Sequence, residues 1–225
     1  MMTKAEQEYL KQIYLYTSGK NEEIHTKELA AMVAAKPASV TDMIKKLAAK
    51  NLIIYNKYRG CYLSDKGLKE ALQIIRRNRL WELFLVEKLG MDWKEVYAIA
   101  SQLQSISSKE LTDKLSFYLG HPTYDPHGEA IPDAKGKLPA TDFIEVYDLK
   151  MNQAAKVIGY KDTGKSFLQY IEKLQLLPGA SLEIISVIEY DKSLEILVDK
   201  KYRYIISKES SQKIYVTTNG TSKTK

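Results

Sequence analysis

The residues best suited to metal or acid–base chemistry gather in one short segment of the chain. They are His121, Asp125, His127 and Glu129. Histidine and carboxylate side chains at this spacing could ligate zinc or serve a hydrolase. Prolines and a glycine separate them, however, and this composition favours an ordered linker. Since no nucleophile–base pattern and no phosphate-cradling glycine loop occurs elsewhere in the sequence, we predict that the protein is not an enzyme and has no small-molecule substrate.

A second group of residues has the chemistry of DNA recognition. In residues 37–50, small and hydroxylated side chains come first and lysines follow, as in a helix whose slim start enters the major groove while its end reaches phosphate. The next segment, "NKYRG", lies between two short apolar runs and predicts a hairpin with cations at its tip, a wing for the DNA backbone or minor groove. The predicted DNA-contacting residues are Thr26, Lys36, Pro37, Ala38, Ser39, Thr41, Lys45, Lys46, Lys57, Tyr58 and Arg59.

Local signals place these residues on a helix-turn-helix. Thr26 is predicted to cap the first helix, and Pro37 has the fixed φ suited to the first turn of the second. Asn51 predicts a left-handed end to that second helix. The residues predicted to be buried are Leu29, Ala30 and Val33 in the first helix and Val40, Ile44 and Leu47 in the second. Without a DNA partner, the same pattern would describe a small helical subdomain with an exposed hairpin.

Positive charge is concentrated in this first part of the chain. Residues 1–79 contain 15 Lys and Arg against 8 Asp and Glu, a balance of +7 (15 − 8), whereas the whole chain carries +6. Such an excess suits a polyanionic partner. No apolar run is long enough to span a membrane and the first residues are polar, so we expect a cytoplasmic protein without a membrane partner. The single cysteine, Cys61, excludes an internal disulfide.

The middle and the end of the chain predict different architectures. Apolar residues recur at helical spacing in residues 66–88, 93–106 and 111–119, and the first of these helices is apolar on more than one face, which favours a homodimer. Residues 120–139 are rich in proline and glycine and predict a linker. Beyond it, "SLEIISVIEY", "LEILVD" and "KYRYIIS" alternate like short strands, and we expect the polar end to be disordered.

Three stretches, in this order, resemble the diphtheria toxin repressor family of iron- and manganese-dependent transcriptional repressors. They are "SVTDMIKKLAAKNLIIYNKYRGCYLSDKG", "RRNRLWELFLVEKLGMDWKEV" and "LGHPTYDPHGEAIP". The resemblance covers nearly the whole chain, since "FLQYIEKLQLLPGASLEI" is similar to the family's SH3-like domain. It implies a mainly α fold with a winged helix-turn-helix, a helical dimerisation domain and a C-terminal SH3-like small β-barrel. We expect these domains at residues 1–72, 73–140 and 141–218, followed by the tail at 219–225.

The same resemblance implies a function and a corepressor. A metal-loaded homodimer would bind double-stranded operator DNA and repress genes of metal homeostasis. The departures from the family pattern all fall on its metal ligands, because weak or non-ligand residues stand at Asn78, Tyr97, Ser101, Gln104 and Ser105. Iron and manganese are usually held by carboxylate and imidazole. The resemblance leaves two candidate ligands that carry a carboxylate, so the predicted metal ligands are Glu8 and Glu82.

Two interpretations stay open. In the first, Fe²⁺ or Mn²⁺ binds Glu8 and Glu82 with neutral neighbours. In the second, there is no metal cofactor, and the stretch Tyr97–Ser108, which lacks any charged side chain, forms a hydrogen-bond network with Asn78 and Glu82 that braces the same helices. The plainest alternative for this stretch is a solvated helix face. If metal is not used, the protein is a metal-independent regulator or an interaction adaptor that acts through its SH3-like domain.

Overall fold

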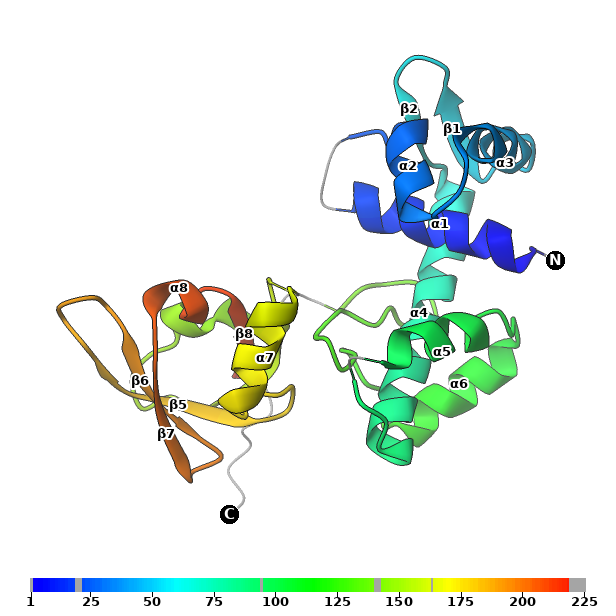
Figure 1. Cartoon of the computed structure of the whole chain (residues 1–225). Coiled ribbons are helices and arrows are strands. Elements are labelled where there is room, and N and C mark those ends of the chain that lie inside the picture. The colour runs from blue at the N-terminus through cyan, green and yellow to red at the C-terminus, as the bar shows by residue number, and fades with distance from the viewer. Residues whose placement is uncertain (1, 19–21, 94, 140–142, 163, 219–225) are drawn as a thin grey trace. The chain divides into compact units, whose positions relative to one another are not determined.

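The computed structural model describes residues 2–18, 22–93, 95–139, 143–162 and 164–218. The chain forms two compact units, the first made of residues 1–123 and 131–138 and the second of residues 124–130 and 139–225 (Figure 1). The predicted disorder of residues 219–225 lies outside the described residues. None of the described helices is long and apolar enough to cross a membrane.

The first unit begins with a winged helix-turn-helix. Its elements are α1 (Lys4–Thr17), α2 (Thr26–Met32), α3 (Pro37–Ala49), β1 (Ile53–Asn56) and β2 (Gly60–Leu63). Buried side chains from all five pack together with the first half of α4 (Asp65–Leu89). As predicted, Val40, Ile44 and Leu47 of α3 are buried in this core.

The ends of the two central helices follow from local hydrogen bonding. Asn51 has a φ of +56°, so the predicted left-handed residue after α3 is confirmed. The prediction that Thr26 caps α2 is wrong by one residue. The N-cap is His25, one residue before Thr26. The His25 amide donates a 3.0 Å hydrogen bond to the Glu28 carboxylate, which fixes the start of the helix at that residue.

The wing is an antiparallel hairpin tied to the rest of the domain through Cys61. The Arg59 amide donates to the Asn56 carbonyl (3.1 Å) across the tip. Ile24 exchanges two backbone hydrogen bonds with Cys61, 3.0 and 2.9 Å long. Gly60 has a φ of +121°, and a Cβ there would lie 2.4 Å from the Ile24 carbonyl oxygen. Only glycine lets the wing approach this closely.

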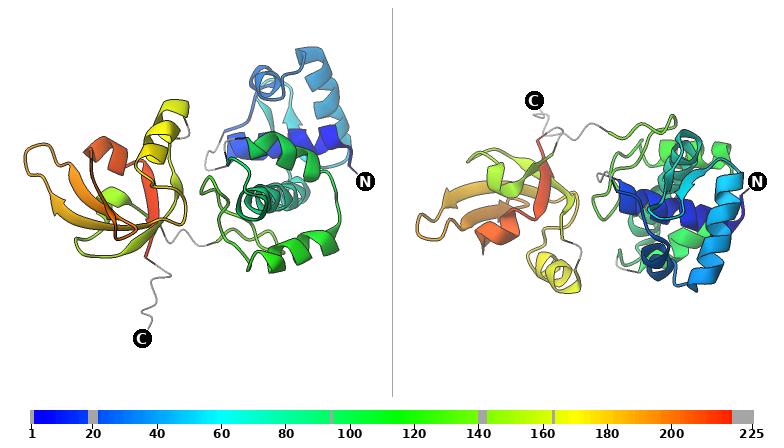
Figure 2. Two further views of the ribbon diagram at one scale, coloured as in Figure 1. Left: turned by 60° about the horizontal axis from the view of Figure 1, so that its bottom comes forward. Right: turned by 90° about the horizontal axis from the view of Figure 1, so that it is seen from above.

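Helix α4 connects the winged helix to a second helical layer. Its bounds are close to the predicted 66–88. Figure 2 shows it end on, among α1, α5 (Val96–Leu103) and α6 (Lys109–Tyr118). Its buried apolar side chains pack within one chain: Leu72 and Ile75 in the winged-helix core, Leu85 against α5. The predicted helix at 93–106 is shorter than expected, because a turn from Asp92 to Glu95 precedes it.

The proline-rich segment is ordered and contributes to both units. In the second unit, the Asp125 carboxylate accepts hydrogen bonds from the amides of His127 (2.8 Å) and Glu129 (2.9 Å) and so fixes a tight loop. In the first unit, the buried Arg76 donates to the Pro132 carbonyl at 2.7 Å, which holds residues 131–138 against α4.

The second unit is built on a six-stranded antiparallel sheet with the order β3-β8-β4-β5-β6-β7. The strands are β3 (Ile144–Glu145), β4 (Ala155–Tyr160), β5 (Ser181–Val187), β6 (Leu194–Val198), β7 (Tyr202–Ile206) and β8 (Ile214–Thr217). The helices are η1 (Val146–Asp148), α7 (Lys165–Lys173) and α8 (Lys208–Ser211). Register shifts in β4 and β5 allow the sheet to bend. Gly128 and Gly159 meet backbone to backbone where the loop crosses β4.

Candidate functional site

The outer face of α3 exposes small side chains first and lysines after them. Ala38 and Ser39 are exposed in its first turn, and Lys45 and Lys46 are exposed in its last turns. Small side chains at the start let the helix sink into a groove, and the lysines that follow can reach phosphate. Thr41 is half-buried, and its hydroxyl donates to the Pro37 carbonyl at 3.0 Å.

The wing presents its cations beside this helix in the same domain. Lys57, Tyr58 and Arg59 are all exposed, and Tyr58 keeps 84% of its surface. The Lys57 ammonium lies 5.9 Å from the centre of the Tyr58 ring. Of the other predicted contacts, Lys36 and Pro37 are exposed, and Thr26 is half-buried at the start of α2.

A buried carboxylate ties α3 to α1. The side chain of Glu6 is fully buried, and its Oε1 lies 3.1 Å from the Lys46 ammonium and 2.7 Å from that of Lys50. Burial raises the pKa of Glu6, but hydrogen bonds from Lys50, the Thr3 amide and Lys46 outweigh it and hold the pKa at about 2. Lys46 therefore anchors α3 as well as facing solvent.

A second buried cation lies where α1 meets α4 and α5. The Lys11 ammonium is 3.2 Å from Glu8 Oε2, donates to Asn78 Oδ1 at 3.4 Å, and lies 4.9 Å from the centre of the Tyr97 ring. Only 1% of Lys11 is exposed. An ammonium removed from water is stable only with such partners. We call the set Glu8, Lys11, Asn78, Glu82, Tyr97 and Gln104 the junction cluster.

Hydrogen bonds connect the remaining members of the junction cluster. Asn78 Nδ2 donates to Glu82 Oε1 (3.1 Å), and Gln104 Nε2 donates to Glu8 Oε2 (3.3 Å). Asn78, Glu82 and Gln104 are all buried. Arg77 extends the network, because its Nε donates to the Gln104 carbonyl at 2.9 Å. Three helices are thus joined through side chains. The uncharged stretch contributes Gln104, which bonds to Glu8 of α1 and not to the expected partners Asn78 and Glu82.

The structure separates the predicted ligand positions into two groups. Asn78 and Gln104, with the predicted ligands Glu8 and Glu82, belong to the junction cluster. Ser101 is half-buried, and the Ser105 hydroxyl donates to the Gln102 carbonyl of its own turn at 2.7 Å. Sequence reasoning missed Lys11. Its spacing of three residues from Glu8 suggests only an ordinary ion pair on the exposed face of one helix.

The junction cluster does not fit a divalent metal. The ammonium of Lys11 already uses the Glu8 carboxylate and the Asn78 carbonyl oxygen, which are the oxygens that a metal would need. A second cation among them would face like charge, and the other groups offer one carboxylate and one amide. The remaining acceptor, Gln104 Oε1, is buried and has no hydrogen-bond partner among the described residues.

Models of three protein domains match successive parts of the chain. The N-terminal DNA-binding domain of iron-dependent repressors matches residues 1–61, their metal-binding and dimerisation domain residues 64–133, and the FeoA domain residues 144–218. An uncharacterized HTH-type transcriptional regulator from Methanocaldococcus jannaschii is 36% identical over 118 residues, which are 52% of this chain and 94% of that protein. The chain belongs to the iron-dependent repressor family.

Members of the iron-dependent repressor family are DNA-binding, metal-dependent transcriptional regulators. The HTH-type transcriptional regulator MntR of Bacillus subtilis is 35% identical over 97 residues, which are 43% of this chain and 67% of MntR. A solved manganese-dependent transcriptional repressor in complex with manganese superposes with a TM-score of 0.71 and 27% identity, over 94% of this chain and 98% of the other. The predicted family and the fold class, winged helix-turn-helix, helical dimerisation domain and SH3-like domain, are confirmed.

Proposed function

We propose that this member of the iron-dependent repressor family is a homodimeric repressor that binds specific operator sequences in double-stranded DNA. Helix α3 is the recognition helix, and the β1–β2 hairpin is the wing. The proposal assigns the protein to the cytoplasm and gives it no enzymatic reaction. The observation that carries it is the face of α3: Val40, Ile44 and Leu47 are buried, while small residues and then lysines are exposed.

Within this surface, the side chains have different roles. Ser39 lies in the first turn of α3 and reads base edges, whereas Lys45 near its end contacts phosphate. The exposed cations of the wing, Lys57 and Arg59, add backbone or minor-groove contacts.

Binding of the full chain to duplexes selected from random sequence, at a series of salt concentrations, tests this assignment. Lys45→Ala should weaken binding to all sequences alike and lower the salt slope by about one unit, because one phosphate contact is lost. Ser39→Ala should instead relax sequence preference. Lys173→Ala in α7 removes the same charge from an exposed site of the second unit and serves as the control. If no sequence is enriched by the wild-type protein with chelator, manganese or ferrous iron, the proposed function is wrong.

A further inference from the structure

We propose that the Lys11 ammonium is a built-in cation that takes the place of a corepressor metal and keeps the protein in its DNA-binding form without metal. The inference rests on the proposed function, since it concerns how the DNA-binding form is stabilised. Its starting point is the position of one buried charge among the side chains that the family resemblance assigned to ligands.

The contacts of Lys11 match those of a bound cation. Its ammonium has a carboxylate oxygen of Glu8 on one side, the carbonyl oxygen of Asn78 on another, and the face of the Tyr97 ring at 4.9 Å. These partners come from α1, α4 and α5. Tyr97 itself is half exposed and lies over the ammonium, of which almost nothing reaches solvent.

The neutral residues of the junction cluster fit a single positive charge. Gln104 donates to the Glu8 oxygen that also pairs with Lys11, and Asn78 donates to Glu82 while it accepts from Lys11. Amides can donate and accept at the same time, so they connect an ammonium to two carboxylates without adding charge. A divalent ion would have to displace this ammonium, because Lys11 already uses oxygens of Glu8 and Asn78.

A tethered cation differs from a metal in one functional respect. A metal stabilises the helix arrangement only when its concentration exceeds its dissociation constant. An ammonium carried by α1 is present in every molecule, so the equilibrium between helix arrangements no longer depends on metal concentration.

The junction cluster is connected to the DNA-binding surface through α1 itself. Glu6 lies little more than one turn before Lys11 and forms ion pairs with Lys46 of α3 and with Lys50 just beyond it. Between them, Leu10 is fully buried in the winged-helix core. The placement of α1 on α4 and α5 therefore also fixes where the recognition helix lies in the first unit.

The test measures DNA affinity of the full chain at fixed salt, in chelator and then with manganese or ferrous iron. The DNA is the duplex enriched from random sequence by the wild-type protein. We expect the wild type to bind in chelator and to change its affinity less than about twofold on adding metal. Lys11→Met, which keeps length but removes the charge, should weaken binding in chelator at least about tenfold. Lys4→Met removes an exposed charge from the same helix and should change binding much less.

A second variant keeps the proposal testable if Lys11→Met does not fold. Lys11→Glu places a third carboxylate beside Glu8 and Glu82. This variant should bind DNA poorly in chelator and recover with manganese, and its thermal midpoint should rise with manganese while that of the wild type stays constant. Far-UV circular dichroism reports whether each variant is folded.

The outcomes separate this inference from the proposed function. Wild-type binding that occurs only with metal would overturn the role of Lys11 and leave the repressor assignment intact. Unchanged binding by folded Lys11→Met in chelator would also overturn it. If the wild type enriches no sequence under any condition, the proposed function itself fails. Tight wild-type binding in chelator, lost in Lys11→Met and regained by Lys11→Glu with manganese, is the result that supports the inference.

Discussion

At the scale of single residues, Glu6 couples protein stability to pH. Its carboxyl has a pKa of about 2, below the ordinary 4.5, because Lys50, the Thr3 amide and Lys46 outweigh the effect of burial. A depressed folded-state pKa stabilises the fold above about pH 4.5, and this stabilisation is lost as the pH falls toward 2. Wild-type unfolding free energy, measured by denaturant titration at each pH, should therefore fall across this window, and Glu6→Gln should flatten the fall.

The ion pair between Glu110 and Lys114 provides the control for Glu6. Both side chains are largely exposed, so Glu110→Gln should leave the pH profile close to that of the wild type. Equal profiles for Glu6→Gln and the wild type would show that the Lys46 and Lys50 pairs do not stabilise the fold.

Substitutions at Gln104 and Ser105 compare a buried side chain that joins two helices with one that bonds only within its own turn. Gln104 is buried and bonded to Glu8, whereas Ser105 bonds a carbonyl of its own turn. Gln104→Ala should cost about 1 kcal/mol or more of unfolding free energy, and Ser105→Ala close to none, by urea denaturation. Losses close to zero for both variants would mean that the uncharged stretch does not brace the helices.

Residue types alone could predict the buried and exposed faces of α3 but not the junction cluster. The buried stripe of α3 follows from helical spacing and is confirmed. The residues on the opposite side, such as Ser39 and Lys45, are exposed. The burial of Lys11 does not follow from its own helix, because it depends on Asn78 and Tyr97, which lie far away in the sequence. Long-range packing decides such a site.

At the scale of elements, the wing depends on one glycine. Gly60→Ala would place a Cβ against the Ile24 carbonyl oxygen at a φ of +121°, so the β2 strand must move away from Ile24. We expect a loss of about 2 kcal/mol or more in unfolding free energy, together with weaker DNA binding. Gly90→Ala, at a φ of +65° with no atom within 4 Å of the new Cβ, should cost only about 1 kcal/mol and leave DNA affinity unchanged.

Element boundaries were predictable where a local signal set them. Helix α4 runs from Asp65 to Leu89, close to the predicted 66–88, because the Ser64 hydroxyl accepts from the Gly67 amide at its start and Gly90 ends it. The proline-rich segment was predicted to be a linker, yet part of it packs into each unit. The Pro132 carbonyl of this segment accepts a hydrogen bond from the distant Arg76 side chain, which composition cannot indicate.

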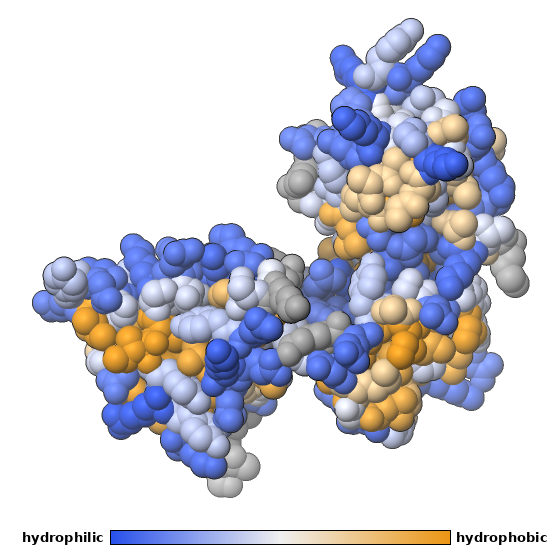
Figure 3. All heavy atoms as spheres, in the orientation of Figure 1, coloured by the Kyte–Doolittle hydropathy of each residue, from blue (hydrophilic) through white to orange (hydrophobic). Residues whose placement is uncertain are grey.

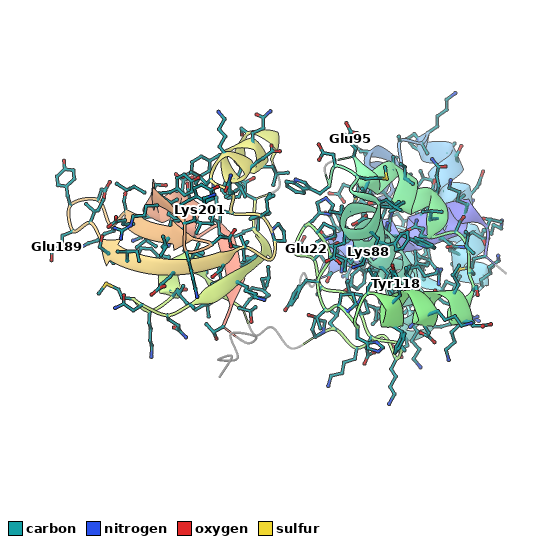
Figure 4. The ribbon with its side chains drawn as sticks, turned by 90° about the horizontal axis from the view of Figure 1, so that it is seen from below. Glu22, Lys88, Glu95, Tyr118, Glu189 and Lys201 are labelled. Carbon is teal, nitrogen blue, oxygen red and sulfur yellow. The ribbon has the colours of Figure 1, made fainter. Side chains whose placement is uncertain are left out.

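At the scale of the whole molecule, the helices α4 to α6 of the first unit expose several large apolar side chains. Figure 3 shows apolar side chains gathered over the helical layer of α5 and α6. The exposed large apolar residues from the end of α4 through α6 are Leu89, Tyr97, Ile99, Ile106, Leu111, Phe117 and Tyr118. Lys88 lies beside Tyr118, with its ammonium 5.9 Å from the ring centre (Figure 4). Exposed apolar side chains of this kind, with a cation beside them, are typical of a protein interface.

Most apolar side chains of α4 pack within one chain, whereas α5 and α6 expose several, so we expect the dimer contact at α5 and α6. These helices lie in the part of the chain that matches the family's metal-binding and dimerisation domain. Two winged helices on one operator bind more tightly than one, because the second contact becomes intramolecular. Loss of the dimer should therefore weaken DNA binding while each recognition helix stays intact.

Ile99→Glu and Phe117→Glu, made separately, test this interface. Both side chains are exposed, so the monomer should fold, but a buried unpaired carboxylate at a dimer contact costs several kcal/mol, on the order of 3 or more. Sedimentation equilibrium should show dimers for the wild type and monomers for at least one variant, which also loses DNA affinity. Tyr190→Glu, at a 98% exposed position of the second unit, should remain dimeric. If both variants stay dimeric, the two copies meet through a different surface, and the apolar side chains of α5 and α6 need another partner.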